Sequence, residues 1–86
     1  MPAYKVDYQS LAPKVEEALR EAFPYETIDV TEGWRGRVHV VVVSKEFNDL
    51  PTERRQRMVY DILEGALGPE AQYVTLVTTW GTADLR

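Results

Sequence analysis

Three arginines lie within four positions of the sequence, in the stretch ERRQRMVYDIL at residues 53–63. They are Arg54, Arg55 and Arg57. Guanidinium groups bind phosphates and carboxylates, so the cluster could hold a nucleic acid or an acidic partner protein. A third interpretation is that these charges only keep one face of a helix solvated. The chain has a formal net charge of −4 at pH 7, which argues against general electrostatic affinity for nucleic acids.

Helical spacing separates the three arginines instead of gathering them. Arg55 falls near the middle of an apolar stripe, so we expect its stem to cover the edge of the core. Its head group would pair with a carboxylate or a strand-end carbonyl, although a functional role fits this position equally well. Arg57 points roughly the opposite way and can pair with Asp61 one turn later, and Arg54 lies at the flank. We therefore predict solvated or partner-facing roles for Arg54 and Arg57. The stripe consists of Met58, Val59, Ile62, Leu63, Ala66 and Leu67.

A second candidate for binding is the glycine-bounded turn GWRG at residues 33–36, which Arg37 follows. An aromatic side chain with arginines beside it can stack on a base and hold a phosphate. The competing interpretation is a hairpin tip with a half-buried tryptophan. A surface for a partner protein or a nucleic acid would combine this turn with the other basic residues: Trp34, Arg35, Arg37, Lys45, Arg54, Arg55 and Arg57.

The side chains for catalysis or metal binding are scarce. The chain has no cysteine, which excludes disulfides, thiolate metal sites and cysteine nucleophiles within it. Its single histidine, His39, lies among valines, which favours a partly exposed strand histidine over a ligand or an acid–base group. The segment GALG at residues 65–68 matches the GxxG loop of KH domains, but glutamates flank it and a capped helix end explains its glycines better. No nucleophile elbow, P-loop or carboxylate pair is present, so we do not expect an enzyme.

Periodicity and turn residues predict five elements. A first helix is expected from about Ser10 to Phe23, with Asp7 or Ser10 as its cap and Pro13 in its first turn. Pro51 can open a second helix, and Gly68 can end it. The remaining elements are strands at 27–32, 37–44 and 73–79, a turn at 33–36 and a loop at 45–51.

The order α-β-β-α-β predicts a single small domain of the α/β (α+β) class over residues 1–86. Residues 1–9 would be an N-terminal segment and 81–86 a polar C-terminal tail. The hairpin supplies an antiparallel pair and the second helix a parallel crossover, which gives a mixed three-stranded sheet with the helices on one face. Both faces of VHVVVV at residues 38–43 are largely apolar, so the uncovered face is a candidate contact surface through which a homodimer could form.

No N-terminal apolar segment is long enough for a signal peptide or a membrane span, so we expect a cytoplasmic protein without a membrane partner.

The stretch GRVHVVVVSKEFNDLPTERRQRMVYDIL resembles the core motif of the BolA family. The matching features are Val40 to Ser44, Phe47, Arg55-Gln56-Arg57, Val59, Tyr60 and Leu63. The order of the flanking elements extends the resemblance to roughly residues 8–85. It implies a KH-like sandwich and a non-enzymatic role. The role would be either iron–sulfur trafficking with a monothiol glutaredoxin and a shared [2Fe-2S] cluster, or DNA binding as a stress-linked transcription regulator.

The sequence departs from this family at the cluster ligands. The resemblance places Tyr73 where the family has a ligand histidine, and a second ligand falls near Arg35 to Arg37. Gln56 replaces the central histidine of the R-H-R motif, and His39 lies two residues beyond the aligned strand position. A neutral phenol is a poor substitute for imidazole, so we expect no cofactor held by this chain alone. A glutaredoxin could still dock, with or without a borrowed cluster, and a KH-like nucleic-acid-binding regulator is the alternative.

Overall fold

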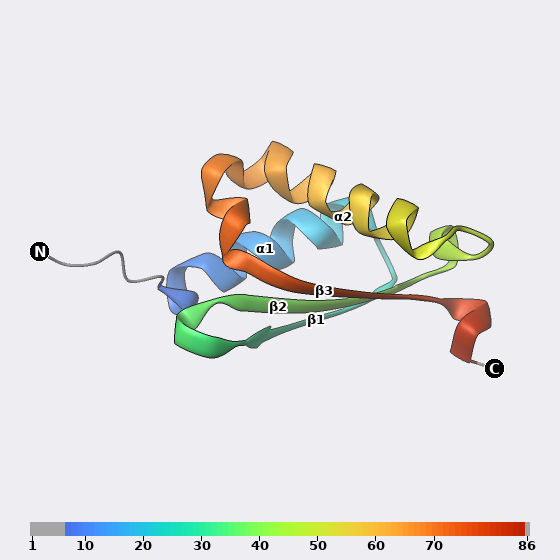
Figure 1. Ribbon diagram of the computed structural model, residues 1–86, viewed down its shortest axis with the longest axis horizontal. Helices are drawn as coiled ribbons and strands as arrows, with labels where there is room; N and C mark the ends of the chain where they lie inside the picture. The colour runs from blue at the N-terminus through green and yellow to red at the C-terminus, as the bar shows by residue number, and fades with distance from the viewer. Residues whose placement is uncertain (1–6, 86) are drawn as a thin grey trace, which may run out of the picture.

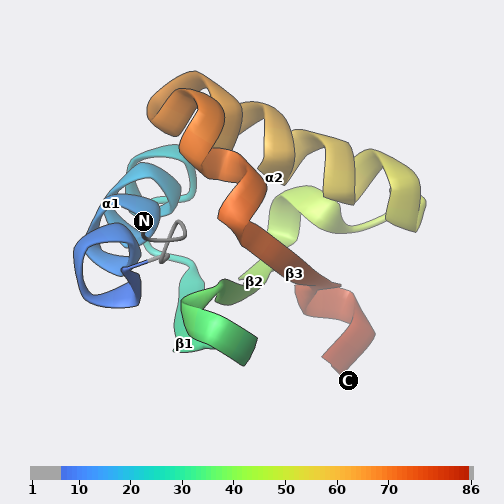
Figure 2. The ribbon, with the colours of Figure 1, turned by 60° about the vertical axis from the view of Figure 1, so that its left-hand side comes forward.

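The structure is a computed structural model that describes residues 7–85. Its three strands form one mixed sheet in the order β1-β2-β3, with β1 antiparallel and β3 parallel to the central β2. Both helices cover the same face of this sheet (Figures 1 and 2), which confirms the predicted α+β architecture. Within residues 7–85 no helix is long and apolar enough to cross a bilayer. The elements are α1 (Tyr8–Ala22), β1 (Thr27–Glu32), β2 (Val38–Ser44), α2 (Thr52–Leu67) and β3 (Val74–Gly81).

The central strand divides its side chains between the two faces of the sheet. Val38, Val40 and Val42 are fully buried beneath the helices. Val41 and Val43 alternate with them, point away from the helices and remain half-buried. Each fully buried valine stabilises the fold by roughly 1.5–3 kcal/mol relative to an exposed one. The helices complete this core with fully buried Val15, Leu19, Val59 and Leu63.

Helix α1 begins two residues earlier than expected. The carboxylate of Asp7 caps it by accepting a hydrogen bond from the backbone N–H of Gln9 at 3.1 Å, and the Ser10 hydroxyl donates to the same carboxylate at 2.8 Å. This earlier start moves Pro13 out of the first turn, which corrects the sequence prediction. Pro13 therefore costs the helix one backbone hydrogen bond, because it has no N–H to donate.

Ser44 ties the end of β2 to the segment before β1. Its buried hydroxyl donates to the Glu26 carboxylate at 2.8 Å, and the backbone N–H of Lys45 donates to the same oxygen at 2.7 Å. These two hydrogen bonds hold the pKa of Glu26 below its ordinary value. Next to them, the ring of Phe47 packs edge to face on Phe23, with 5.4 Å between the ring centroids.

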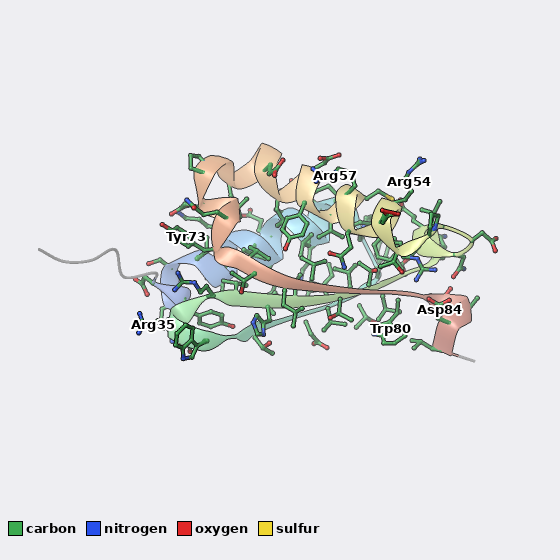
Figure 3. All side chains as sticks on the ribbon, viewed as in Figure 1. Arg35, Arg54, Arg57, Tyr73, Trp80 and Asp84 are labelled. Atoms are coloured by element: carbon green, nitrogen blue, oxygen red, sulfur yellow. The ribbon has the colours of Figure 1, made fainter. Side chains whose placement is uncertain are left out.

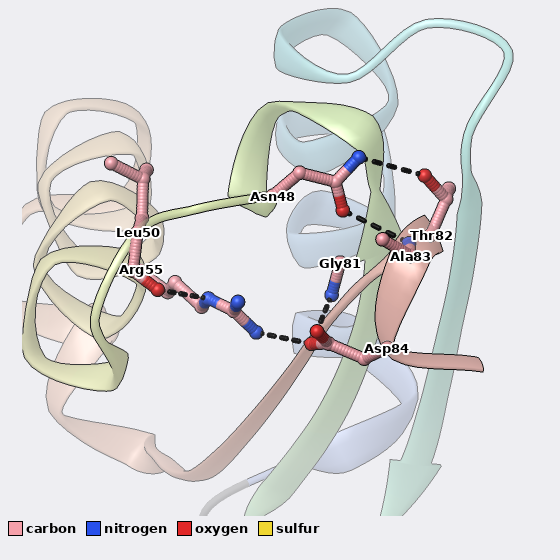
Figure 4. Close-up of polar contacts among 7 residues, drawn as sticks. All are labelled: Asn48, Leu50, Arg55, Gly81, Thr82, Ala83 and Asp84. Atoms are coloured by element: carbon pink, nitrogen blue, oxygen red, sulfur yellow. Dashed lines mark hydrogen bonds and ion pairs between the residues drawn. The ribbon is translucent and has the colours of Figure 1, made fainter. Parts of the chain in front are cut away.

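The C-terminal residues, which the sequence suggested as a polar tail, form a turn that is hydrogen-bonded to the rest of the fold. Strand β3 continues through Gly81, and the residues Thr82–Leu85 form a 3₁₀ turn. The side-chain amide of Asn48 donates to the Thr82 hydroxyl at 3.1 Å and accepts from the backbone N–H of Ala83 at 3.0 Å (Figure 4). The Asn48 side chain also occupies the space that a Cβ at position 81 would need, so a larger residue than Gly81 would displace it.

A pair of identical substitutions on opposite faces of β2 tests this architecture. We expect Val40→Thr to lower the free energy of unfolding by about 1–3 kcal/mol, because it buries a hydroxyl with no partner beneath the helices. Val41→Thr, one residue along the strand on the face opposite the helices, is expected to change it by less than about 0.5 kcal/mol. Urea denaturation of both variants measures the difference. Equal losses would contradict the assigned faces.

Candidate partner-binding surface

The structure does not gather the basic candidate residues into one patch. Strand β2 lies between the turn at residues 33–37 and Lys45, and its seven residues span roughly 23 Å at about 3.3 Å per residue. Arg54 and Arg57 lie on α2, away from Arg35 at the hairpin tip (Figure 3). A single nucleic-acid strand could not contact all of these cations at one short site.

Arg55 has a structural role, which is one of the two roles that the sequence left open for it. Its Nε donates to the backbone carbonyl of Leu50 at 2.8 Å, and its terminal nitrogen pairs with the Asp84 carboxylate at 2.6 Å (Figure 4). The Arg55 side chain is only 12% exposed. The hydrogen bond from Arg55, followed by one from the backbone N–H of Gly81, holds the pKa of Asp84 below its ordinary value. Arg55 therefore fastens the first turn of α2 to the preceding loop and to the C-terminal turn.

The other two arginines of the cluster face solvent, as the sequence predicts. Arg57 pairs with Asp61 at 3.2 Å, and both side chains are largely exposed. Such a surface pair on a helix contributes about 0.3–0.5 kcal/mol. Arg54 is exposed, and no carboxylate of residues 7–85 pairs with it.

Gln56, between Arg55 and Arg57, points toward the sheet. Its side-chain amide donates to the backbone carbonyl of Val77 on β3. This is the position at which the BolA motif has its central histidine, and here the side chain serves as a clamp between α2 and β3. Sequence analysis missed the contact, because its partner lies 21 residues away and no local pattern marks it.

The hairpin tip and Tyr73 come together at the opposite end of the sheet. Val38 pairs with Val74 in the parallel ladder, which places the preceding residues, Arg37 and Tyr73, at the same end of adjacent strands. Figure 3 shows Tyr73 and Arg35 at this end of the molecule. The two regions that the BolA resemblance assigns to cluster ligands are therefore neighbours in space.

Trp34 at the tip is exposed, and the expected half-buried tryptophan is a wrong prediction. It is 75% exposed, and the Arg35 guanidinium lies over its ring, 4.6 Å from the ring centroid. Arg35 has a φ of 56°, in the left-handed region that few non-glycine residues adopt. An exposed tryptophan stacked with arginine joins two of the residue types that contribute most to binding interfaces.

A shallow depression of about 670 Å³ lies between the end of α2 and the start of β3. On one side Tyr60 donates its hydroxyl to the backbone carbonyl of Val74 at 3.0 Å, and burial raises the pKa of Tyr60, so this phenol stays neutral. Gly68, with a φ of 61°, caps α2 at its rim, so the GALG segment is a helix end here. The lining residues are Tyr60, Glu64, Gly68, Pro69, Ala71, Gln72, Val74 and Thr75.

The residues at this end do not suit a [2Fe-2S] cluster. Such clusters are bound by cysteine thiolates or histidine imidazoles, whereas the ligand-equivalent positions carry guanidinium groups and the phenol of Tyr73. His39 instead packs its ring against Gly33 on the sheet face opposite the helices. Within residues 7–85 no group of three or more histidine, cysteine, aspartate or glutamate side chains is arranged to hold a metal ion.

No family model and no curated protein matches the sequence. Among solved structures, the crystal structure of a Bol-like protein from Babesia bovis matches 96% of this chain and 93% of its own, with a TM-score of 0.57 and 20% sequence identity. The chain has a BolA-like fold. The expected architecture is thus confirmed at the level of the fold.

The largely buried Arg55 and the exposed Arg57 can be distinguished by mutation. We expect Arg55→Ala to lower the free energy of unfolding by about 1–3 kcal/mol, because the Leu50 carbonyl loses a charged donor and the stem loses its packing. The matched control Arg57→Ala should cost less than about 0.5 kcal/mol. Denaturant melts measure both, and NMR titration should show the pKa of Asp84 rising in the Arg55 variant only. Equal stability of the two variants would disprove the structural role of Arg55.

Proposed function

We propose that this chain is a non-enzymatic adaptor that binds a partner protein, such as a monothiol glutaredoxin, at the end of the sheet that carries the hairpin tip. The observation that carries the proposal is the pairing of Val38 with Val74. This pairing places Tyr73 beside the turn at residues 33–37 and next to the depression at the end of α2. The BolA-like fold supports a role of this class, in iron–sulfur or stress-related regulation in the cytoplasm.

The chemistry of this end suits recognition of a protein surface. Trp34 and Arg35 are already exposed, so they can enter a pocket on a partner without any rearrangement of the fold. The neighbouring depression can receive a side chain from the partner. Such a complex does not depend on a metal ligand from this chain. Any cluster would be held by groups of the partner and its small-molecule ligands.

Ser44 and Glu26 could suggest a catalytic pair, but the burial of Ser44 argues against that role. Ser44 and Glu26 bring a hydroxyl within 2.8 Å of a carboxylate. The Ser44 side chain is fully buried, so a substrate could not reach its hydroxyl. We therefore assign this pair to the stability of the fold.

Two exposed aromatic residues at opposite ends of β1 provide the test. We expect Trp34→Ala to weaken binding of a monothiol glutaredoxin at least tenfold, equivalent to about 1.4 kcal/mol. Tyr25→Ala removes a fully exposed aromatic at the other end and should leave the affinity unchanged. Isothermal titration calorimetry measures both variants, with the glutaredoxin in its apo and its cluster-loaded form. No binding of either form, or equal effects of the two variants, would contradict the proposal.

The absorption spectrum of the complex separates docking from cluster sharing. Replacing Tyr73 by histidine should strengthen retention of a [2Fe-2S] cluster, because it restores an imidazole at the ligand-equivalent position. If the native complex already has a cluster spectrum that Tyr73→Phe abolishes, the phenol is a ligand and our assignment of Tyr73 is wrong.

A nucleic-acid-binding regulator is the second candidate, and the exposed stack of Arg35 on Trp34 favours it. The net charge of −4 and the separation of the basic residues count against it. We therefore expect no salt-dependent binding of single-stranded or duplex DNA near physiological ionic strength. Fluorescence anisotropy at two salt concentrations measures this. Binding that weakens with salt and is lost in Trp34→Ala would favour the regulator over the adaptor.

A further inference from the structure

The hairpin tip carries two arginines, Arg35 and Arg37, that have no carboxylate of this chain as a partner. The chain has 14 acidic and 10 basic residues, so carboxylates are plentiful. The ion pairs among residues 7–85 nevertheless include neither of these two arginines. Lys45 and Arg54 also lack an ion pair in this part of the chain, but each lies on a different segment. Arg35 and Arg37 are two positions apart in one turn, so the tip concentrates uncompensated positive charge.

The turn holds both guanidinium groups in place. The Arg35 guanidinium lies over the Trp34 ring, 4.6 Å from its centroid. The Arg37 guanidinium donates to the backbone carbonyl of Arg35 at 3.4 Å, so it lies against the same turn. In the backbone, the N–H of Arg37 donates to the Trp34 carbonyl at 3.2 Å, and the N–H of Gly33 donates to the Arg37 carbonyl at 2.7 Å. The two charges are therefore positioned before a partner arrives, which lowers the entropic cost of binding.

The backbone at Arg35 is unfavourable for an arginine. Its φ of 56° and ψ of 38° lie in the left-handed region, and the next residue, Gly36, has a φ of 78°. Positive φ at two consecutive central residues is the geometry of a type I′ hairpin turn, in which asparagine or aspartate usually precedes the glycine. No ion pair within residues 7–85 offsets the cost of placing an arginine there. Such a backbone outlier points to a role for the Arg35 side chain outside the fold.

The surroundings of the tip favour an isolated carboxylate over a chain of phosphates. Guanidinium groups bind either anion, often through two parallel hydrogen bonds. A nucleic acid presents a phosphate at every nucleotide, so it requires a continuous path of cations. Here the exposed Glu32 pairs with Val38 at the base of the hairpin, and Glu64 lines the neighbouring depression. These carboxylates would repel further phosphates, whereas an aspartate or glutamate on a protein surface needs only the two arginines.

We infer that Arg35 and Arg37 bind an aspartate or glutamate of the partner protein, while Trp34 packs on an apolar side chain beside it. This inference rests on the proposed adaptor function, because it specifies the chemistry of the partner at the same site. The partner then presents an acidic surface to the hairpin tip. Because the pairs form between exposed charges, added salt weakens the complex.

Short peptides test the carboxylate site without the partner protein. The probe is an acetylated and amidated tetraglutamate, and tetraglutamine in the same form is the neutral control. In ¹⁵N NMR spectra of the full chain at low ionic strength, tetraglutamate should shift the backbone amides of residues 33–37, and tetraglutamine should not. The affinity for tetraglutamate at these amides should fall about fivefold or more in Arg35→Asn and stay unchanged in Arg54→Gln, which removes an exposed charge on α2. Arg35→Asn should not lower the melting temperature, because asparagine adopts the left-handed conformation more readily than arginine.

The same two variants separate this inference from the proposed function. In calorimetric titrations with a monothiol glutaredoxin, Arg35→Asn should weaken binding about fivefold or more, and Arg54→Gln should leave it unchanged. If the glutaredoxin does not bind the wild-type chain while tetraglutamate behaves as predicted, the proposed function fails and the carboxylate site stands. If the glutaredoxin binds wild type and Arg35→Asn equally, or if tetraglutamate leaves residues 33–37 unshifted, the carboxylate site is wrong. A single-stranded octathymidylate that shifts the same amides at a lower concentration than tetraglutamate would overturn it in favour of a nucleic acid.

Discussion

The burial of Val38, Val40 and Val42 against both helices is the interaction on which the rest of the structure depends. It fixes which face of the sheet the helices cover, and the two helices of residues 7–85 leave the other face exposed. The same packing holds α1 and α2 above the outer strands. From there, Tyr8, Tyr60 and Gln56 reach the edge carbonyls. A single apolar layer thus positions the side chains that bind these carbonyls.

The two ends of the sheet have different roles. At one end, Arg55 joins α2, the loop before it and the C-terminal turn through two hydrogen bonds. At that end, the charged groups of Arg55 and Asp84 stabilise the fold. At the other end, the Trp34–Arg35 stack projects into solvent beside Tyr73 and a depression. This contrast supports our assignment of partner recognition to the hairpin tip rather than to the arginines of α2.

Local sequence patterns predicted the features that depend on neighbouring residues. The alternation in VHVVVV, the glycine cap at Gly68 and the inward position of Arg55 all follow from periodicity and backbone preference. Some of the features that were missed depend on distant partners. Asn48 turns the expected tail into a docked turn through contacts 34 and 35 residues away. The exposed Trp34 was missed as well, and the residue beside it, Arg35, has a left-handed backbone that few non-glycine residues adopt.

The central claim is that a partner protein binds the end of the sheet formed by the hairpin tip and Tyr73. NMR mapping tests it most directly, by adding unlabelled monothiol glutaredoxin to the ¹⁵N-labelled chain and following every backbone amide. The account predicts that shifts cluster at residues 33–37 and 68–75, while Arg54, Arg57 and Asp84 stay unchanged. Shifts centred on the first turns of α2, or none at saturating partner, would contradict it.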